Sequence, residues 1–73
     1  MTTNWNSILK TGKQIRSAVR FAKGDLSGSE FYSYFKNTEA GGEVRNLLRS
    51  GGVNRARQLT RKALSRRMID VIA

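Results

Sequence analysis

The chain has 73 residues and a formal net charge of +9, from 14 lysines and arginines against 5 aspartates and glutamates. This length has room for one small domain, so we predict a single basic domain over residues 1–73. The sequence contains no cysteine and no histidine, which excludes disulfide bonds, cysteine-based zinc sites and the usual general bases and nucleophiles of enzymes. We therefore predict a protein that is not an enzyme and needs no cofactor or metal.

The periodicity of apolar residues predicts an all-α fold, a small bundle of three or four helices joined by glycine-rich turns. The first helix is predicted over residues 4–23, capped by Thr3 or Asn4 and ended by Gly24. Gly12 is expected inside it, as a kink or a close approach to another helix. Its apolar face consists of Trp5, Ile8, Gly12, Ile15, Val19 and Ala22, and a basic stripe roughly opposite consists of Lys10, Lys13, Arg16, Arg20 and Lys23.

A short aromatic helix is predicted over residues 30–36, with Ser29 as its cap. Phe31 and Phe35 lie on one side of it and are assigned to the core, whereas Tyr32 is expected to be more exposed. The alternative use of this aromatic cluster is to stack on unpaired bases.

Two further helices are predicted over residues 42–50 and 54–71, separated by Gly51–Gly52 and with Asn54 capping the last one. Val44, Leu47 and Leu48 form the apolar side of the third helix. The apolar side of the last helix consists of Ala56, Leu59, Ala63 and Leu64, continued by Met68, Val71 and Ile72. The acids Glu30, Glu39 and Glu43 are expected in first turns, where the helix dipole favours negative charge.

Basic side chains dominate the last part of the chain. From Arg45 onward, eight lysines and arginines stand against one acid, Asp70. Such a segment repels itself unless an anion lies beside it. Arginine supplies nine of the 14 cations, and its planar fork matches phosphate. We therefore predict binding to DNA or RNA, mainly through phosphates, which gives affinity and little sequence preference.

The main predicted contacts are Arg55, Arg57, Arg61, Lys62, Arg66 and Arg67. The basic stripe of the first helix would form a second surface. An architectural or packaging role in a nucleoprotein particle such as a virion fits contacts of this kind better than specific regulation does. The expected location is the cytoplasm or the inside of such a particle, because the N-terminal residues lack the apolar run of a signal peptide.

The start of the last helix is expected to be an anion-binding corner. Free backbone N–H groups there attract anions, and Arg55 and Arg57 occupy the first turn, where a helix tuned only for stability would carry acids. The glycine pair also gives residues 43–67 a loose similarity to a helix-turn-helix motif. In that alignment, however, Arg57 or Gln58 falls where the motif needs an apolar contact.

The alternative is a structural or interaction protein that docks on an acidic protein assembly or an anionic membrane. The basic amphipathic first helix, with Trp5 at one end, resembles membrane-surface helices in pattern. The apolar share of 38% is also low for a self-sufficient core, since small domains without staples rarely hold more than about 3–5 kcal/mol. A partner, a second copy or a larger assembly is therefore expected to complete the fold.

Overall fold

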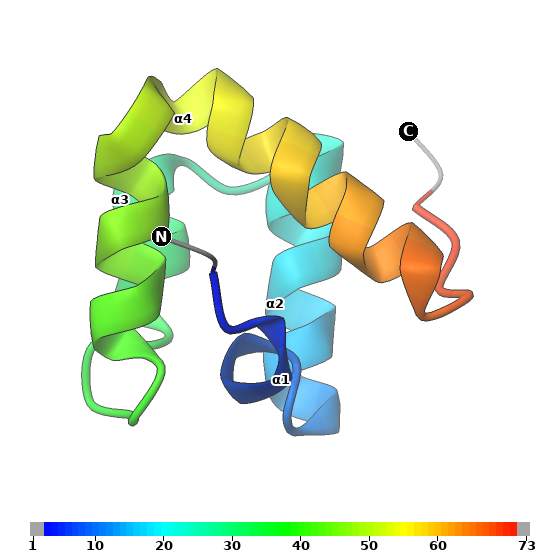
Figure 1. The fold of residues 1–73 in the computed structure, drawn as a ribbon, viewed down its shortest axis with the longest axis horizontal. Coiled ribbons are helices and arrows are strands. Elements are labelled where there is room, and N and C mark those ends of the chain that lie inside the picture. Colours follow the sequence, from blue (N-terminus) through cyan, green and yellow to red (C-terminus); the bar gives the residue numbers. More distant parts are fainter. Residues whose placement is uncertain (1–2, 72–73) are drawn as a thin grey trace.

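The computed structural model describes residues 3–71, and this part of the chain contains four helices and no strand (Figure 1). The predicted all-α class is confirmed. Among these residues no helix is long and apolar enough to cross a membrane. The helices are α1 (Trp5–Ile8), α2 (Gly12–Lys23), α3 (Gly28–Ser33) and α4 (Gly41–Arg66).

The region predicted as one helix over residues 4–23 is two helices, so that prediction is wrong. Thr11 caps α2: its hydroxyl accepts from the backbone N–H of Gln14, and the Gln14 side chain accepts from the Thr11 N–H. Such a reciprocal pair starts a new helix. Gly12 therefore opens α2 and does not kink a longer helix. The predicted end at Gly24 is confirmed, with φ of 95°.

The short aromatic helix begins earlier than predicted, because Ser27 and not Ser29 is its cap. The Ser27 hydroxyl accepts from the Glu30 N–H, while the Glu30 carboxylate accepts from the Ser27 N–H. The helix ends at Ser33, and turns lead from there into α4. Glu30 lies in the first turn as predicted.

α4 bends sharply at Gly52, and the two arms run in different directions in Figure 1. Gly52 has φ of 84° and ψ of 173°, a left-handed φ that glycine adopts at little cost. The predicted break at the glycine pair is therefore at the right place, although no loop separates the arms. Asn54 has helical dihedrals and is not the predicted cap, because a cap residue is non-helical. We call residues 41–51 the first arm and residues 53–66 the second arm.

α4 ends at Arg66, short of the predicted residue 71. Met68 adopts a left-handed φ of 61°, and the N–H groups of Met68 and Ile69 donate to the carbonyls of Ser65 and Leu64. This pattern of two bonds closes a helix. The Met68 side chain is 94% exposed, so its predicted place on the apolar side is wrong. Val71 is half-buried, and Ile72 lies outside the described residues.

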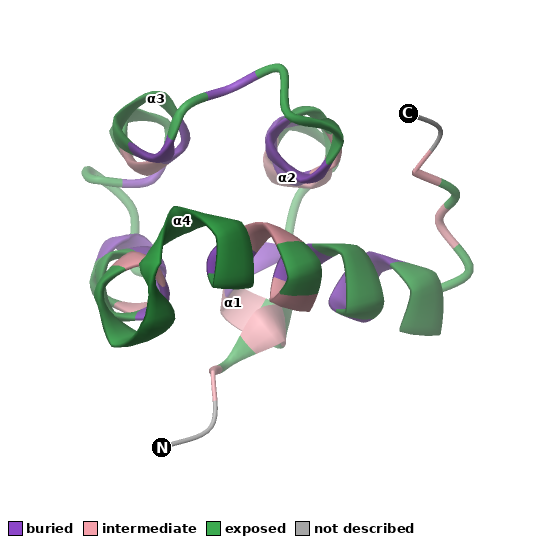
Figure 2. Cartoon of the chain, turned by 90° about the horizontal axis from the view of Figure 1, so that it is seen from above, coloured by how far each residue is buried: buried purple, intermediate pink, exposed green. Residues whose placement is uncertain are grey.

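Three phenylalanine rings form the centre of the core. Phe21, Phe31 and Phe35 are fully buried. The rings of Phe21 and Phe31 stack with centroids 4.2 Å apart, and Phe35 meets Phe31 edge-on at 5.1 Å. Figure 2 shows the buried sides of α2, α3 and α4 turned toward one another. The prediction for Phe31 and Phe35 is confirmed, whereas the central role of Phe21 was missed.

The buried side of α2 also differs from the prediction. It consists of Ser17, Ala18, Phe21 and Ala22. Ile15 and Val19, which were predicted to lie at the centre of the apolar face, are half-buried and pack against the edge of the core.

Candidate nucleic-acid interface

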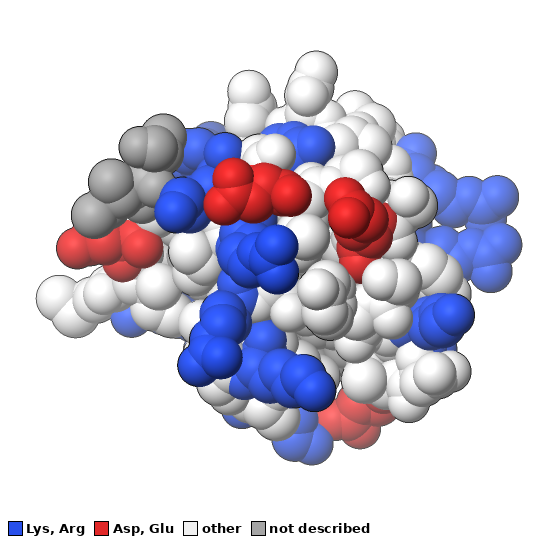
Figure 3. Space-filling view, turned by 180° about the vertical axis from the view of Figure 1, so that it is seen from behind, with Lys and Arg blue, Asp and Glu red and all other residues white. Residues whose placement is uncertain are grey.

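One continuous basic face runs along α2. Four of its residues are cations spaced three and four apart, all exposed, and the helix contains no acid. At 100° and 1.5 Å per residue they form one stripe about 15 Å long, about 150° around the helix from its buried side. Figure 3 shows Lys and Arg side chains gathered in a band over α2 on the rear of the molecule. We call Lys13, Arg16, Arg20 and Lys23 the α2 face.

Lys10 was predicted in this stripe, but the structure places it before α2. Its Nζ lies 2.8 Å from Oε1 of Glu39, and both side chains are well exposed. The hydrogen bond and the charge of Glu39 raise the pKa of Lys10, and the same interactions lower the pKa of Glu39. Glu39 lies ahead of α4 and not in a first turn, so that prediction is wrong. Glu43 does lie in the first turn of α4, where it accepts from the Asn4 N–H.

An acid borders the α2 face at its C-terminal end. The pKa of Glu30 is lowered first by the hydrogen bond from the Ser27 backbone N–H, then by the Ser27 hydroxyl, and to a smaller extent by the charge of Arg20. Glu30 is thus already engaged in capping α3. Its carboxylate stays ionised at neutral pH and places one negative charge beside Arg20.

Two predicted phosphate contacts, Arg57 and Arg61, bind the backbone at the end of α2 and in the turn after it. Arg57 Nη1 donates to the carbonyls of Phe21 at 3.0 Å and Leu26 at 3.1 Å, and its guanidinium lies 4.8 Å from the centroid of the Phe21 ring. Arg61 Nη2 donates to the Ala22 carbonyl at 2.9 Å. The carbonyls at the end of a helix carry its partial negative charge. Both arginines therefore hold α4 against the end of α2.

The remaining basic residues of the second arm point elsewhere. Arg55, Lys62 and Arg66 are exposed, and we call them the α4 face. At 100° per residue they lie about 140° around the helix from Arg57 and Arg61. Within the described part of the chain, none of the three makes a hydrogen bond or an ion pair through its side chain. All three cationic groups are thus available to a partner.

Of the two arginines predicted to form an anion-binding corner at the start of the last helix, only Arg55 remains there. Arg57 turns away to α2. The Arg55 side chain folds back over Gly51, where a Cβ atom would overlap it. Gly51 therefore leaves room for Arg55 to lie along the bend of α4.

The last predicted contact, Arg67, follows the end of α4. Its Nη2 donates to Oδ1 of Asn6, which ties α1 to the end of the second arm. Arg66 and Arg67 also line a small hollow with the half-buried Trp5. The structure thus gives Arg67 a contact within the chain, although its side chain remains exposed.

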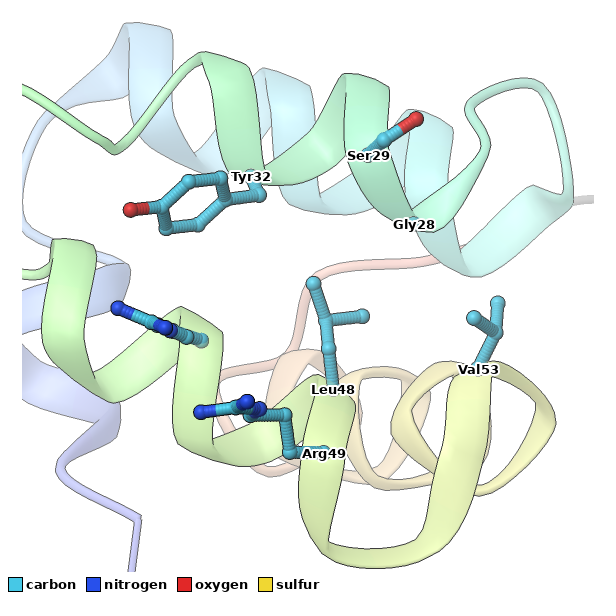
Figure 4. A pocket seen from close by; sticks show the side chains of 7 residues that line it. Gly28, Ser29, Tyr32, Leu48, Arg49 and Val53 are labelled. Carbon is cyan, nitrogen blue, oxygen red and sulfur yellow. The ribbon is translucent and has the colours of Figure 1, made fainter.

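A groove that the sequence does not predict lies between α3 and the part of α4 around its bend (Figure 4). It has a volume of about 440 Å³. Leu48 and Val53 give it an apolar lining. Tyr32 stands on the α3 side and is half-buried, so it is more exposed than Phe31 and Phe35. Two exposed arginines, Arg45 and Arg49, line it one helical turn apart. That spacing is the signal in the sequence from which this pair could have been found.

Comparison of the chain with protein-family models, with curated proteins and with solved structures finds no match. Within residues 3–71, no group of three or more acids lies where it could hold a metal ion. The basic side chains are therefore the surface feature that bears on function.

Proposed function

We propose that this protein is a non-catalytic nucleic-acid-binding protein. It contacts the phosphates of DNA or RNA through the Lys and Arg side chains of α2 and α4, and it acts in the architecture or packaging of a nucleoprotein particle such as a virion. The observation that carries the proposal is the α2 face, on which four exposed cations share one side of a helix without an acid.

The α2 face is electrostatically unfavourable in the isolated protein. Successive cations on it are three or four residues apart, and like charges at these spacings destabilise a helix. A partner with regularly spaced negative charges removes this repulsion, and each neutralised phosphate releases counterions. A phosphate backbone offers such charges along its whole length.

The membrane alternative depends on a long first helix with an apolar face. In the structure α1 spans four residues, Ile8 is fully buried, and Trp5 packs against the core. The apolar residues that would enter a bilayer are thus engaged inside the protein. This arrangement favours nucleic acid over a membrane surface as the partner.

The test is a titration of the protein into labelled duplex DNA and single-stranded RNA at several salt concentrations. If all four cations of the α2 face meet phosphates, the log–log slope of affinity against salt is about −4 or steeper. The matched variant replaces Lys13, Arg16, Arg20 and Lys23 by Gln, which keeps helix propensity and removes the charge. Its slope is expected to be shallower than that of the unchanged protein, because the contacts of the α2 face are lost.

Thermal unfolding of the variant checks that its fold is intact. Absence of binding to either nucleic acid at about 0.15 M salt would overturn the proposal. In that case vesicles of anionic lipid and an acidic protein are the next partners to titrate, since they represent the two alternatives.

A further inference from the structure

The two basic faces point away from each other. α2 makes its largest contact with α4. The side of the second arm that carries Arg57 and Arg61 faces the end of α2. The α4 face lies about 140° around its helix from that side, and the α2 face lies about 150° from the buried side of α2. In Figure 1 the second arm passes in front of α2, while Figure 3 shows the α2 face from behind.

A single duplex cannot contact both faces. The Cα atoms of the protein span only 26 × 23 × 23 Å. Duplex DNA is stiff, with a persistence length of about 50 nm, so it does not fold around so small a particle held by a few cations. One duplex therefore occupies one face and leaves the other exposed.

The chemistry of the faces suits a duplex backbone. All seven of their residues, four on α2 and three on α4, are Lys or Arg. Proteins that hold unpaired strands add aromatic side chains on which bases stack, and neither face includes one. Both faces thus offer cations to phosphates, and the nearest aromatic side chains are at their edges, with Trp5 beside Arg66 and Tyr34 in the same hollow as Lys13.

We infer that one molecule of this protein bridges two nucleic-acid duplexes, with one duplex on the α2 face and the other on the α4 face. The inference rests on the proposed function and specifies how packaging would work. Repulsion between the two duplexes is weak in this arrangement. The protein between them is about 23 Å thick, whereas charges in 0.1 M salt are screened beyond about 10 Å.

A capture assay tests the bridge. One DNA duplex is fixed to beads, the protein is added and washed, and a second duplex of the same sequence carrying a fluorophore is then offered. The protein is expected to retain the fluorescent duplex on the beads. Two variants remove one face each by Gln substitution, at Lys13, Arg16, Arg20 and Lys23 or at Arg55, Lys62 and Arg66. Each is expected to bind one duplex in direct titration and to lose capture of the second.

The matched control removes three exposed cations outside both faces, by Lys36→Gln, Arg45→Gln and Arg49→Gln. It is expected to keep capture, because both faces stay intact. If a face variant melts early, the two-residue variants Arg16→Gln/Arg20→Gln and Lys62→Gln/Arg66→Gln replace it.

The outcomes separate the two proposals. Binding of one duplex without capture of a second by the unchanged protein overturns the bridge and leaves the proposed function standing. Absence of any binding overturns the proposed function itself. The bridge through these faces is also overturned if both face variants still capture the second duplex. A bridge formed by one molecule is overturned if light scattering finds two protein molecules for each pair of duplexes.

Discussion

The α2 face and the second arm of α4 carry similar cations but use them differently. All four basic side chains of α2 point to solvent. On the second arm, Arg57 and Arg61 turn inward to carbonyls at the end of α2 and in the turn after it. The difference comes from what lies beside each helix, because the free carbonyls at the C-terminal end of a helix attract cations. A count of basic residues therefore does not measure how much charge a surface presents.

The largest expected effect follows from removing Arg57. Arg57→Ala leaves two carbonyls without their charged donor and removes the cation over the Phe21 ring. Hydrogen bonds to charged groups contribute about 1.5–3 kcal/mol. A loss of about 2 kcal/mol lowers the melting temperature of a domain of this size by roughly 10 °C. Thermal unfolding followed by circular dichroism measures the change.

Arg55→Ala is the matched control for this prediction. It removes the same side chain two residues away, from a position without a hydrogen bond among the described residues. Its effect on stability should stay within about 0.5 kcal/mol. Equal melting temperatures for the two variants would show that Arg57 does not hold the fold.

A smaller effect is expected for Arg61. Its guanidinium makes one hydrogen bond, to the Ala22 carbonyl, and the residue is exposed. Water can replace the lost donor, so Arg61→Ala should lower the free energy of unfolding by about 0.5–1 kcal/mol. Chemical denaturation is precise enough to measure this. A loss as large as that of Arg57→Ala would contradict the ranking of the two arginines.

Much of the helical fold was predictable, and the errors at the first helix share one cause. The capping pair Thr11 and Gln14 lies inside a run whose apolar spacing fits a single helix from Trp5 to Ala22. The spacing alone does not reveal the helix start that the cap encodes. Because a new helix starts at Thr11, the apolar pattern restarts there, and Phe21 falls on the buried side. The signal was local and present in the sequence.

The roles of the basic residues were less predictable from the sequence. The stripe on α2 follows from spacing within one helix, and the structure retains four of its five predicted members on that face. The roles of Arg57 and Arg61 depend on where the end of α2 lies against α4. That position is set by the packing of Phe21, Phe31 and Phe35. No pattern within the last helix contains this information.

The acid that borders the α2 face gives a pH-dependent test. The pKa of Glu30 in the folded protein is lowered from its ordinary value of 4.5 by the Ser27 backbone N–H, then the Ser27 hydroxyl. Because the pKa is lowered in the folded protein, the ionised carboxylate stabilises the fold at every pH above the ordinary pKa of glutamate. This contribution disappears as the pH falls through the folded-state pKa. The melting temperature of the unchanged protein should therefore exceed that of Glu30→Gln at neutral pH. The two melting temperatures should converge in acid.

Gln at position 30 is a matched substitution because it can still serve in the capping pair with Ser27. Ser27→Ala, by comparison, removes the hydroxyl that accepts from the Glu30 N–H and should lower the melting temperature at every pH. A difference between the unchanged protein and Glu30→Gln that persisted well below the ordinary pKa would contradict the role of the ionised carboxylate.

The smallest expected effect concerns Lys10. It tests whether a lysine that has the spacing of the α2 face, but lies outside α2, contributes to binding. Lys10 has the spacing of the α2 face, but its Nζ binds Glu39. Glu39 already offsets the charge of Lys10, so a phosphate gains less from contacting it. Lys10→Gln should therefore change the salt slope of DNA binding by clearly less than one, whereas Arg16→Gln should make it shallower by about 1. Equal changes would extend the α2 face to Lys10 and show that an exposed ion pair opens readily when a phosphate competes for its lysine.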